Sequence, residues 1–124
     1  MDDYFTHEKA LADIVHNFKG EWLITGCHNN LNPVYTGDIH LGNNKLGSPS
    51  CLTIRKGCGV KFDETLVWLL DCDFYKRMYE KYGAPTILNG DYVTIGVGKH
   101  QATHLLTNKA KEKEIMLLRQ KYVR

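Results

Sequence analysis

The sequence lacks three features that would assign a protein class directly. None of its four cysteines stands in a Cys-X-X-Cys pair, so a structural zinc site is not expected. No apolar run approaches the roughly 20 residues that a membrane-spanning helix needs. The charge is nearly balanced, with 16 basic and 14 acidic residues. A net charge of +2 gives no reason to expect nucleic acid as the main partner.

The first residues also lack the apolar segment of a secretory signal, because Asp2, Asp3, His7 and Glu8 are polar. Without an export signal, reduced thiols in a cytoplasmic protein are expected. The C-terminal segment is rich in basic residues, which most simply form the solvated face of a helix. A phosphate-binding or membrane-surface patch is the alternative. These residues are Lys109, Lys111, Lys113, Arg119, Lys121 and Arg124.

What the sequence does contain suits one domain over residues 1–124, with 43% hydrophobic residues. Residues 28–49 are rich in Asn, Gly and Pro, which indicates a long loop with a short extended piece near 34–41. Asn89-Gly90 predicts a hairpin turn. The predicted helices cover residues 5–18, 71–82 and 103–122, and the predicted strands cover residues 22–27, 51–55, 86–88 and 92–97. This is an α/β chain with a mixed sheet.

Four motifs follow one another in a specific order. They are Asp2-Asp3-Tyr4-Phe5; Gly47-Ser48-Pro49-Ser50 with Arg55-Lys56 and residues 59–64; Leu70-Asp71-Cys72-Asp73-Phe74 with Arg77; and residues 98–103. Their order and spacing resemble the second half of family 2 glycosyltransferases, over nearly the whole chain. The resemblance implies a partial GT-A-like mixed sheet flanked by helices, without the N-terminal strands that bind the nucleotide.

The sequence departs from the family pattern at three points. Leu70 stands where the family has a glutamate before its catalytic aspartate, and the acidic motif lacks the aspartate expected two residues before Asp2. The resemblance would place a nucleotide-binding segment before Asp2, where this sequence has only Met1. The chain therefore resembles a truncated enzyme, a separately encoded half or an excised domain. A partner chain that supplies the nucleotide-binding half, or a homo-oligomer, is implied.

The resemblance implies transfer of a sugar, with inversion, from a nucleotide-diphosphate sugar to a hydroxyl of a glycan or lipid-linked acceptor. Asp2 and Asp3 are the candidate ligands of Mg²⁺ or Mn²⁺ beside the leaving diphosphate, since these ions prefer oxygen ligands. The resemblance implies that one of them holds the metal and that the other contacts the ribose or the sugar. Asp71 would be the general base that takes the proton of the acceptor. His100 would approach the diphosphate or the metal.

Trp68 and Asp73 are the candidates for binding the acceptor, Trp68 because an aromatic face packs against the C–H groups of a sugar. Each acidic candidate has a simpler alternative, because an aspartate at the start of a helix often only caps it. The alternative function is a non-catalytic binding or assembly module that keeps the acceptor-side fold and possesses a bare sheet edge for self-association. Nucleic-acid binding through the basic C-terminal helix is a weaker third possibility.

Overall fold

The computed structural model describes residues 3–39, 41, 46, 48–96 and 105–122, and these form a mixed α/β fold. The helices are α1 (Ala10–Asn17), α2 (Leu70–Tyr82) and α4 (Asn108–Tyr122), and η1 (Pro49–Cys51) is a short 3₁₀ turn. The strands are β1 (Tyr4–Phe5), β2 (Trp22–Cys27), β3 (Leu52–Ile54) and β4 (Thr86–Thr94). The mixed sheet expected from the sequence is therefore present.

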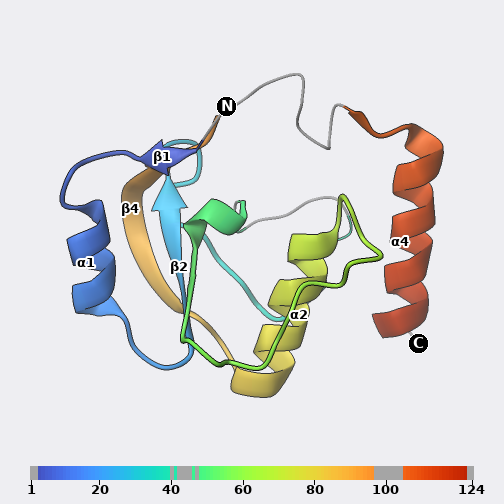
Figure 1. Cartoon of the computed structure of the whole chain (residues 1–124), viewed down its shortest axis with the longest axis horizontal. Coiled ribbons are helices and arrows are strands. Elements are labelled where there is room, and N and C mark those ends of the chain that lie inside the picture. The colour runs from blue at the N-terminus through green and yellow to red at the C-terminus, as the bar shows by residue number, and fades with distance from the viewer. Residues whose placement is uncertain (1–2, 40, 42–45, 47, 97–104, 123–124) are drawn as a thin grey trace.

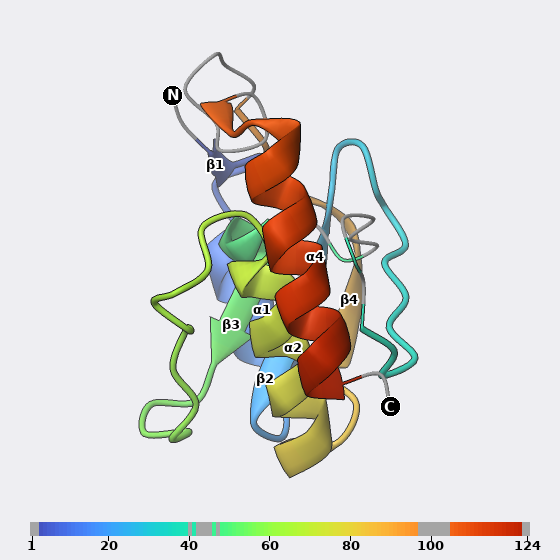
Figure 2. The same ribbon diagram turned by 90° about the vertical axis from the view of Figure 1, so that its right-hand side faces the viewer.

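The four strands form one sheet in the order β1-β4-β2-β3. β2 and β4 are parallel, whereas β1 and β3 run antiparallel to their neighbours. α1 lies on one side of this sheet and α2 on the other, and α4 lies outside α2 (Figures 1 and 2). Because both faces are covered, all six residues of β2 are buried, as expected for a central strand between two helical layers.

The main core lies between the sheet and α2. Phe74, Tyr75 and Met78 come from one stripe of the helix and pack against Trp22 of β2. The indole Nε1 of Trp22 also donates to the carbonyl of Gly83 at a distance of 3.0 Å, just after α2 ends. Gly83 adopts φ 81°, which a glycine accepts without strain and which ends the helix. The expected helix over residues 71–82 is thus confirmed almost to the residue.

The predicted hairpin at Asn89-Gly90 is wrong, because β4 continues through these residues. The backbone of Gly90 adopts φ 127°, and its N–H donates to the carbonyl of Leu31 at 2.8 Å. Along β4, the residues that pair with β2 skip from Leu88 to Val93, so the intervening residues bulge out of register. The glycine therefore serves a bulge in one strand instead of a turn between two strands.

The starts of two helices and one extended piece differ from those expected. Tyr4 and Phe5 belong to β1 because they pair with β4, so the first helix begins only at Ala10. The last helix begins at Asn108. No strand is assigned to the described part of residues 34–41.

Within the described ranges, no helix has both the length and the apolar character that crossing a membrane requires.

Candidate functional site

Three separate segments meet at the carboxyl end of the parallel strands β2 and β4 (Figure 1). β1 pairs with the last residues of β4. η1 precedes β3, whose first residue pairs with Ile24 in the middle of β2, so η1 lies toward the carboxyl end of β2. α2 leads directly into the start of β4, so its own first turn lies toward the opposite, carboxyl end. Open α/β sheets bind ligands at this end of their strands. The topology thus brings Asp3, next to β1, and Asp71, in α2, to the same end of the sheet.

The Asp3 carboxylate is held by donors from two directions. Its Oδ2 accepts hydrogen bonds from the hydroxyls of Ser50 (2.5 Å) and Ser48 (3.2 Å), and its Oδ1 accepts from the Gly96 N–H (2.8 Å). Partial burial alone would raise its pKa, but the hydrogen bonds from Ser50, Gly96 and Ser48 outweigh it and hold the pKa of Asp3 below 3.8. Asp3 is therefore an ionised carboxylate with a fixed orientation.

A pocket of about 270 Å³ opens beside this carboxylate, and it is lined by Asp3, Tyr4, Phe5, Ser50 and Val93. Tyr4 is 60% exposed and Phe5 is 48% exposed, which is unusual for large aromatic side chains. Aromatic faces at a pocket rim suit the C–H surfaces of a sugar ring. The sequence prediction did not assign these two residues a function, although their position directly after the acidic pair was the available signal.

Asp71 occupies the first turn of α2 and is partly exposed. Its Oδ1 accepts a hydrogen bond from the Cys72 N–H at 2.8 Å. The partial positive charge of a helix N-terminus stabilises a nearby carboxylate. The position of Asp71 is therefore compatible with both readings of the sequence, a helix-end residue and a base that faces an acceptor.

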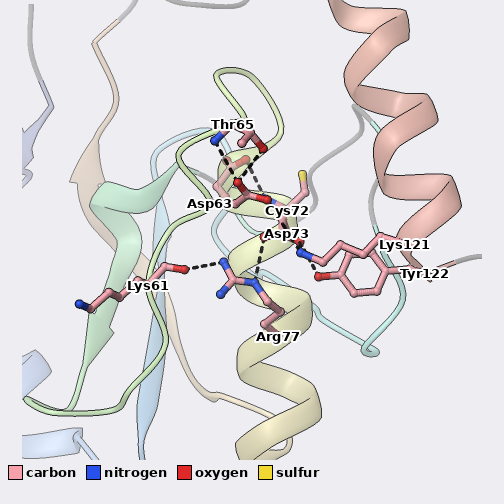
Figure 3. A network of polar contacts seen from close by, with 9 residues as sticks. Lys61, Asp63, Thr65, Cys72, Asp73, Arg77, Lys121 and Tyr122 are labelled. Atoms are coloured by element: carbon pink, nitrogen blue, oxygen red, sulfur yellow. Dashed lines mark hydrogen bonds and ion pairs between the residues drawn. The ribbon is translucent and has the colours of Figure 1, made fainter.

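Asp73, two residues further on, is wholly buried and joins α2 to α4 (Figure 3). Its carboxylate forms ion pairs with Arg77 Nε and Lys121 Nζ, each at 2.9 Å, and it accepts a hydrogen bond from the Tyr122 hydroxyl. Burial, followed by this hydrogen bond, raises the pKa of Tyr122. In this structure the Asp73 carboxylate has no surface to offer an acceptor. Its predicted role in acceptor binding stays a prediction, and the contacts it makes are structural.

Glu114 of α4 is a second buried carboxylate, and the sequence prediction missed it. It accepts hydrogen bonds from the backbone N–H groups of Val67 (3.1 Å), Trp68 (2.9 and 3.3 Å) and Leu69 (3.0 Å), directly before α2. A carboxylate in this position satisfies amide groups that a helix start leaves unpaired. The available signal was its place four residues before Leu118, on the buried stripe of α4.

Trp68 lies between these two helices. It is partly buried, packs with the apolar cluster that joins α2 and α4, and has Lys111 Nζ at 5.3 Å from its ring centroid. Its backbone is fixed by Glu114. The predicted contact of Trp68 with an acceptor stays a prediction.

Two predicted site residues, Asp2 and His100, lie outside the described residues. Among those that are described, no group of three or more His, Cys, Asp or Glu side chains gathers as metal ligands would. Asp3 by itself fits Mg²⁺ or Mn²⁺, which commonly take one or two protein carboxylates and complete their shell with substrate phosphates and water.

Burial and the neighbouring Cys27 raise the pKa of the Cys51 thiol to about 12, so Cys51 is a poor nucleophile near neutral pH.

Comparison of the chain with protein-family models, with curated proteins and with solved structures found no match in any of the three.

Proposed function

We propose that the chain is the acceptor-binding half of an inverting sugar transferase with a partial GT-A-like fold. One observation carries the proposal: β1, which follows Asp3, and the first turn of α2, which contains Asp71, are far apart in the sequence, yet both lie toward the carboxyl end of the parallel strands. The order of the motifs around them resembles that of family 2 glycosyltransferases. The substrates would be a nucleotide-diphosphate sugar and a hydroxyl group of a glycan or lipid-linked acceptor.

Asp71 is the proposed general base. The acceptor oxygen attacks the anomeric carbon from the side opposite the diphosphate, and Asp71 takes the hydroxyl proton as the new bond forms. The bond between the sugar and the diphosphate breaks, and the diphosphate leaves with the electron pair. A positioned base of this kind contributes about 10²–10⁴ in rate. Asp71 suits the task because its carboxylate is partly exposed, whereas that of Asp73 is buried in ion pairs.

Asp3, together with Asp2, is the proposed ligand of Mg²⁺ or Mn²⁺. Such an ion stabilises the negative charge that develops on the leaving diphosphate. Ser48 and Ser50 orient the Asp3 carboxylate toward the pocket by donating to its Oδ2. His100 is proposed to contact the diphosphate.

The pocket beside Asp3 is the proposed seat of a sugar ring. Tyr4 and Phe5 line this pocket and are exposed, so they offer it aromatic surface. A nucleotide-binding segment, on this or another chain, would have to hold the rest of the donor. The chain alone is therefore expected to bind acceptor sugars more readily than to transfer them.

The first test is binding. Mono- and oligosaccharides are titrated into the isotope-labelled chain in a buffer that contains Mg²⁺ instead of Mn²⁺. The chemical shifts of the backbone amides are followed by NMR. The expected result is a set of shifts at Tyr4, Phe5 and Ser50 that Tyr4→Ala removes. A matched control is Met116→Ala, because Met116 is also 60% exposed but lies on α4. Absence of shifts with every sugar class would contradict the proposed acceptor pocket.

The second test is transfer. The chain is combined with the protein segment that supplies nucleotide binding, with nucleotide-diphosphate sugars and Mn²⁺, and products are identified by mass spectrometry. Asp71→Asn is expected to lower the rate by about 10²–10⁴. Glu112→Gln is the control, because this carboxylate is exposed on α4. Transfer that survives Asp71→Asn unchanged would rule out Asp71 as the base.

A further inference from the structure

Asn89 and Gly90 form the one Asn-Gly pair of the sequence. Such a pair is chemically labile, because the backbone nitrogen of the second residue can attack the asparagine side chain, and glycine has no side chain to hinder the attack. Asn89 is exposed, so water reaches the reacting groups. The sequence alone would therefore place a site of rapid deamidation in the middle of β4.

The reaction needs only water and hydroxide. The Gly90 nitrogen gives its proton to hydroxide and forms a bond to Cγ of Asn89. The bond between Cγ and Nδ2 breaks, and the departing nitrogen takes a proton from water and leaves as ammonia. The five-membered imide then adds one water and opens to an aspartyl or isoaspartyl residue at position 89. In sum one water is consumed and one ammonia is released, with no oxidation or reduction.

The fold engages the atom that must react. The Gly90 N–H donates to the carbonyl of Leu31 at 2.8 Å, so the nitrogen cannot lose its proton or turn toward the Asn89 side chain until this bond breaks. The turn before Leu31 is itself fixed, because Cys27 and Asn30 exchange two backbone hydrogen bonds of 3.0 Å each. The acceptor is therefore held in place beside β4.

Gly26 of β2 lies against both partners of this hydrogen bond. A side-chain carbon added at Gly26 would lie 2.2 Å from the carbonyl oxygen of Gly90 and 2.6 Å from that of Leu31. Both distances are too short for atoms that are not bonded to each other, so only a glycine allows this close approach. A substitution at Gly26 must therefore displace Gly90, Leu31 or both, while it leaves the Asn-Gly pair unchanged.

We propose that Asn89 is a site of spontaneous deamidation that the hydrogen bond between Gly90 and Leu31 protects, so that a chain is modified only while this contact is open. Local contacts of a folded protein open and close without global unfolding. Each opening exposes the Gly90 nitrogen for a short time, and the reaction makes some of these openings irreversible.

The product changes the centre of the sheet. It carries one more negative charge, two residues before Asp91, and its isoaspartyl form adds one atom to the backbone of β4. β4 pairs with β2 through Leu88 and Val93, on either side of the bulge that contains position 89. An altered charge and backbone length between these two pairs should weaken the pairing of β4 with β2.

The first measurement compares the folded chain with the same chain in urea that unfolds it, at one pH and temperature. Mass spectrometry of peptides follows the conversion of the Asn89 amide to a carboxylate. We expect the folded chain to react at least about fivefold more slowly, the factor that corresponds to one hydrogen bond. Equal rates would overturn the proposed protection, and an unfolded chain that keeps its Asn89 amide would overturn the site itself.

Two variants separate local from global opening. Gly26→Ala should accelerate the reaction of the folded chain at least about fivefold, because it displaces the contact between Gly90 and Leu31. In urea its rate should equal that of the unchanged chain. Phe74→Ala is the matched control, because it removes a side chain from the core between α2 and the sheet and should lower the stability without touching the bulge.

Equal acceleration by Phe74→Ala and Gly26→Ala would show that the reaction follows global unfolding, and this would overturn the role of the Gly90 contact. If circular dichroism shows that Gly26→Ala does not fold, the folded and unfolded rates of the unchanged chain and of Phe74→Ala decide. The modified chain, separated by its added charge, should unfold at a lower urea concentration. An unchanged midpoint would overturn the expected effect on β4. None of these outcomes depends on the proposed sugar transfer.

Discussion

The two sides of α2 are held by different kinds of contact. On the side of the sheet, Phe74, Tyr75 and Met78 enter an apolar cluster that is rich in aromatic rings. On the side of α4, a smaller apolar cluster is joined by two buried carboxylates, Asp73 and Glu114. The first interface holds α2 against the sheet by apolar packing. The second holds α4 against α2 through hydrogen bonds and ion pairs at two defined points.

The difference lies in how each interface responds to change. Apolar packing has no preferred direction, so swaps that keep the volume are tolerated, and the loss of a large side chain is costly because it leaves a cavity. A buried carboxylate tolerates little change of either kind, because its removal leaves several donors without an acceptor. The α4 side should therefore be the more selective of the two interfaces, although it is smaller.

The largest effect is expected on the side of the sheet. Phe74 is 1% exposed, so Phe74→Ala should reduce the free energy of unfolding by about 3–5 kcal/mol, through lost burial and a cavity. Urea denaturation followed by circular dichroism measures this loss. Met116→Ala, at an exposed position, should change the stability by less than about 0.5 kcal/mol. A loss below about 1 kcal/mol for Phe74→Ala would mean that this cluster does not dominate the fold.

Asp73→Ala is expected to have the next largest effect, about 2–3 kcal/mol, because it removes the acceptor shared by Arg77, Lys121 and Tyr122. The value lies below that of a fully buried pair because the side chains of Arg77 and Lys121 are 27% and 42% exposed. Tryptophan fluorescence should report the loosening of α4, since Trp68 lies in the cluster between the helices.

The matched control for Asp73 is Glu80, which pairs with Lys76 at 3.6 Å on the exposed surface of the same helix. Glu80→Ala should cost no more than about 1 kcal/mol, as surface ion pairs do. Equal losses for the two variants would show that burial does not distinguish the α4 side of α2 from its surface.

A smaller and more local effect is expected at Glu114. Glu114→Ala leaves the N–H groups of Val67, Trp68 and Leu69 without their acceptor and should cost about 1–3 kcal/mol. Glu114→Gln keeps one amide oxygen as an acceptor and should cost less. Hydrogen exchange at these three amides should accelerate in Glu114→Ala while amides of β2 keep their protection. Unchanged exchange at residues 67–69 would show that the Glu114 carboxylate does not protect these amide groups.

The sequence was sufficient for the elements whose signal is local. The apolar run of β2 and the stripe Phe74, Met78 and Tyr82 of α2 predicted those elements almost to the residue. The hairpin prediction failed because the same Asn-Gly pair suits a turn or a bulge. A contact decided between them, since the Gly90 N–H finds its acceptor in Leu31, which is far away along the chain.

The candidate site shows the same limit. The acidic residues at the start of α2 were recognisable, and Arg77, four residues after Asp73, was a local signal of an ion pair, but nothing local shows that Asp73 is buried. Only the position of α4 does so, because Lys121 and Tyr122 reach Asp73 and bury it. Likewise Glu114 reads as one charge in a basic helix until its partners in residues 67–69 are known. Ligand chemistry is visible in sequence motifs, whereas the division of carboxylates into structural and reactive groups depends on the tertiary fold.

The smallest effect is expected at Asp3, whose exposed carboxylate accepts hydrogen bonds from two serine hydroxyls and a backbone N–H. The pKa of Asp3 lies below its unfolded value of 3.8, so its stabilisation is fully present above that value and disappears as the pH falls through the lowered pKa. Asp3→Asn should therefore lower the unfolding temperature slightly at neutral pH, and this difference from the unchanged chain should shrink in strong acid. Thermal unfolding at several pH values measures it. A difference that stayed constant down to strong acid would show that the ionised form of Asp3 contributes nothing to stability. The hydrogen bonds of an exposed carboxylate would then not stabilise the fold as those of the buried Asp73 do.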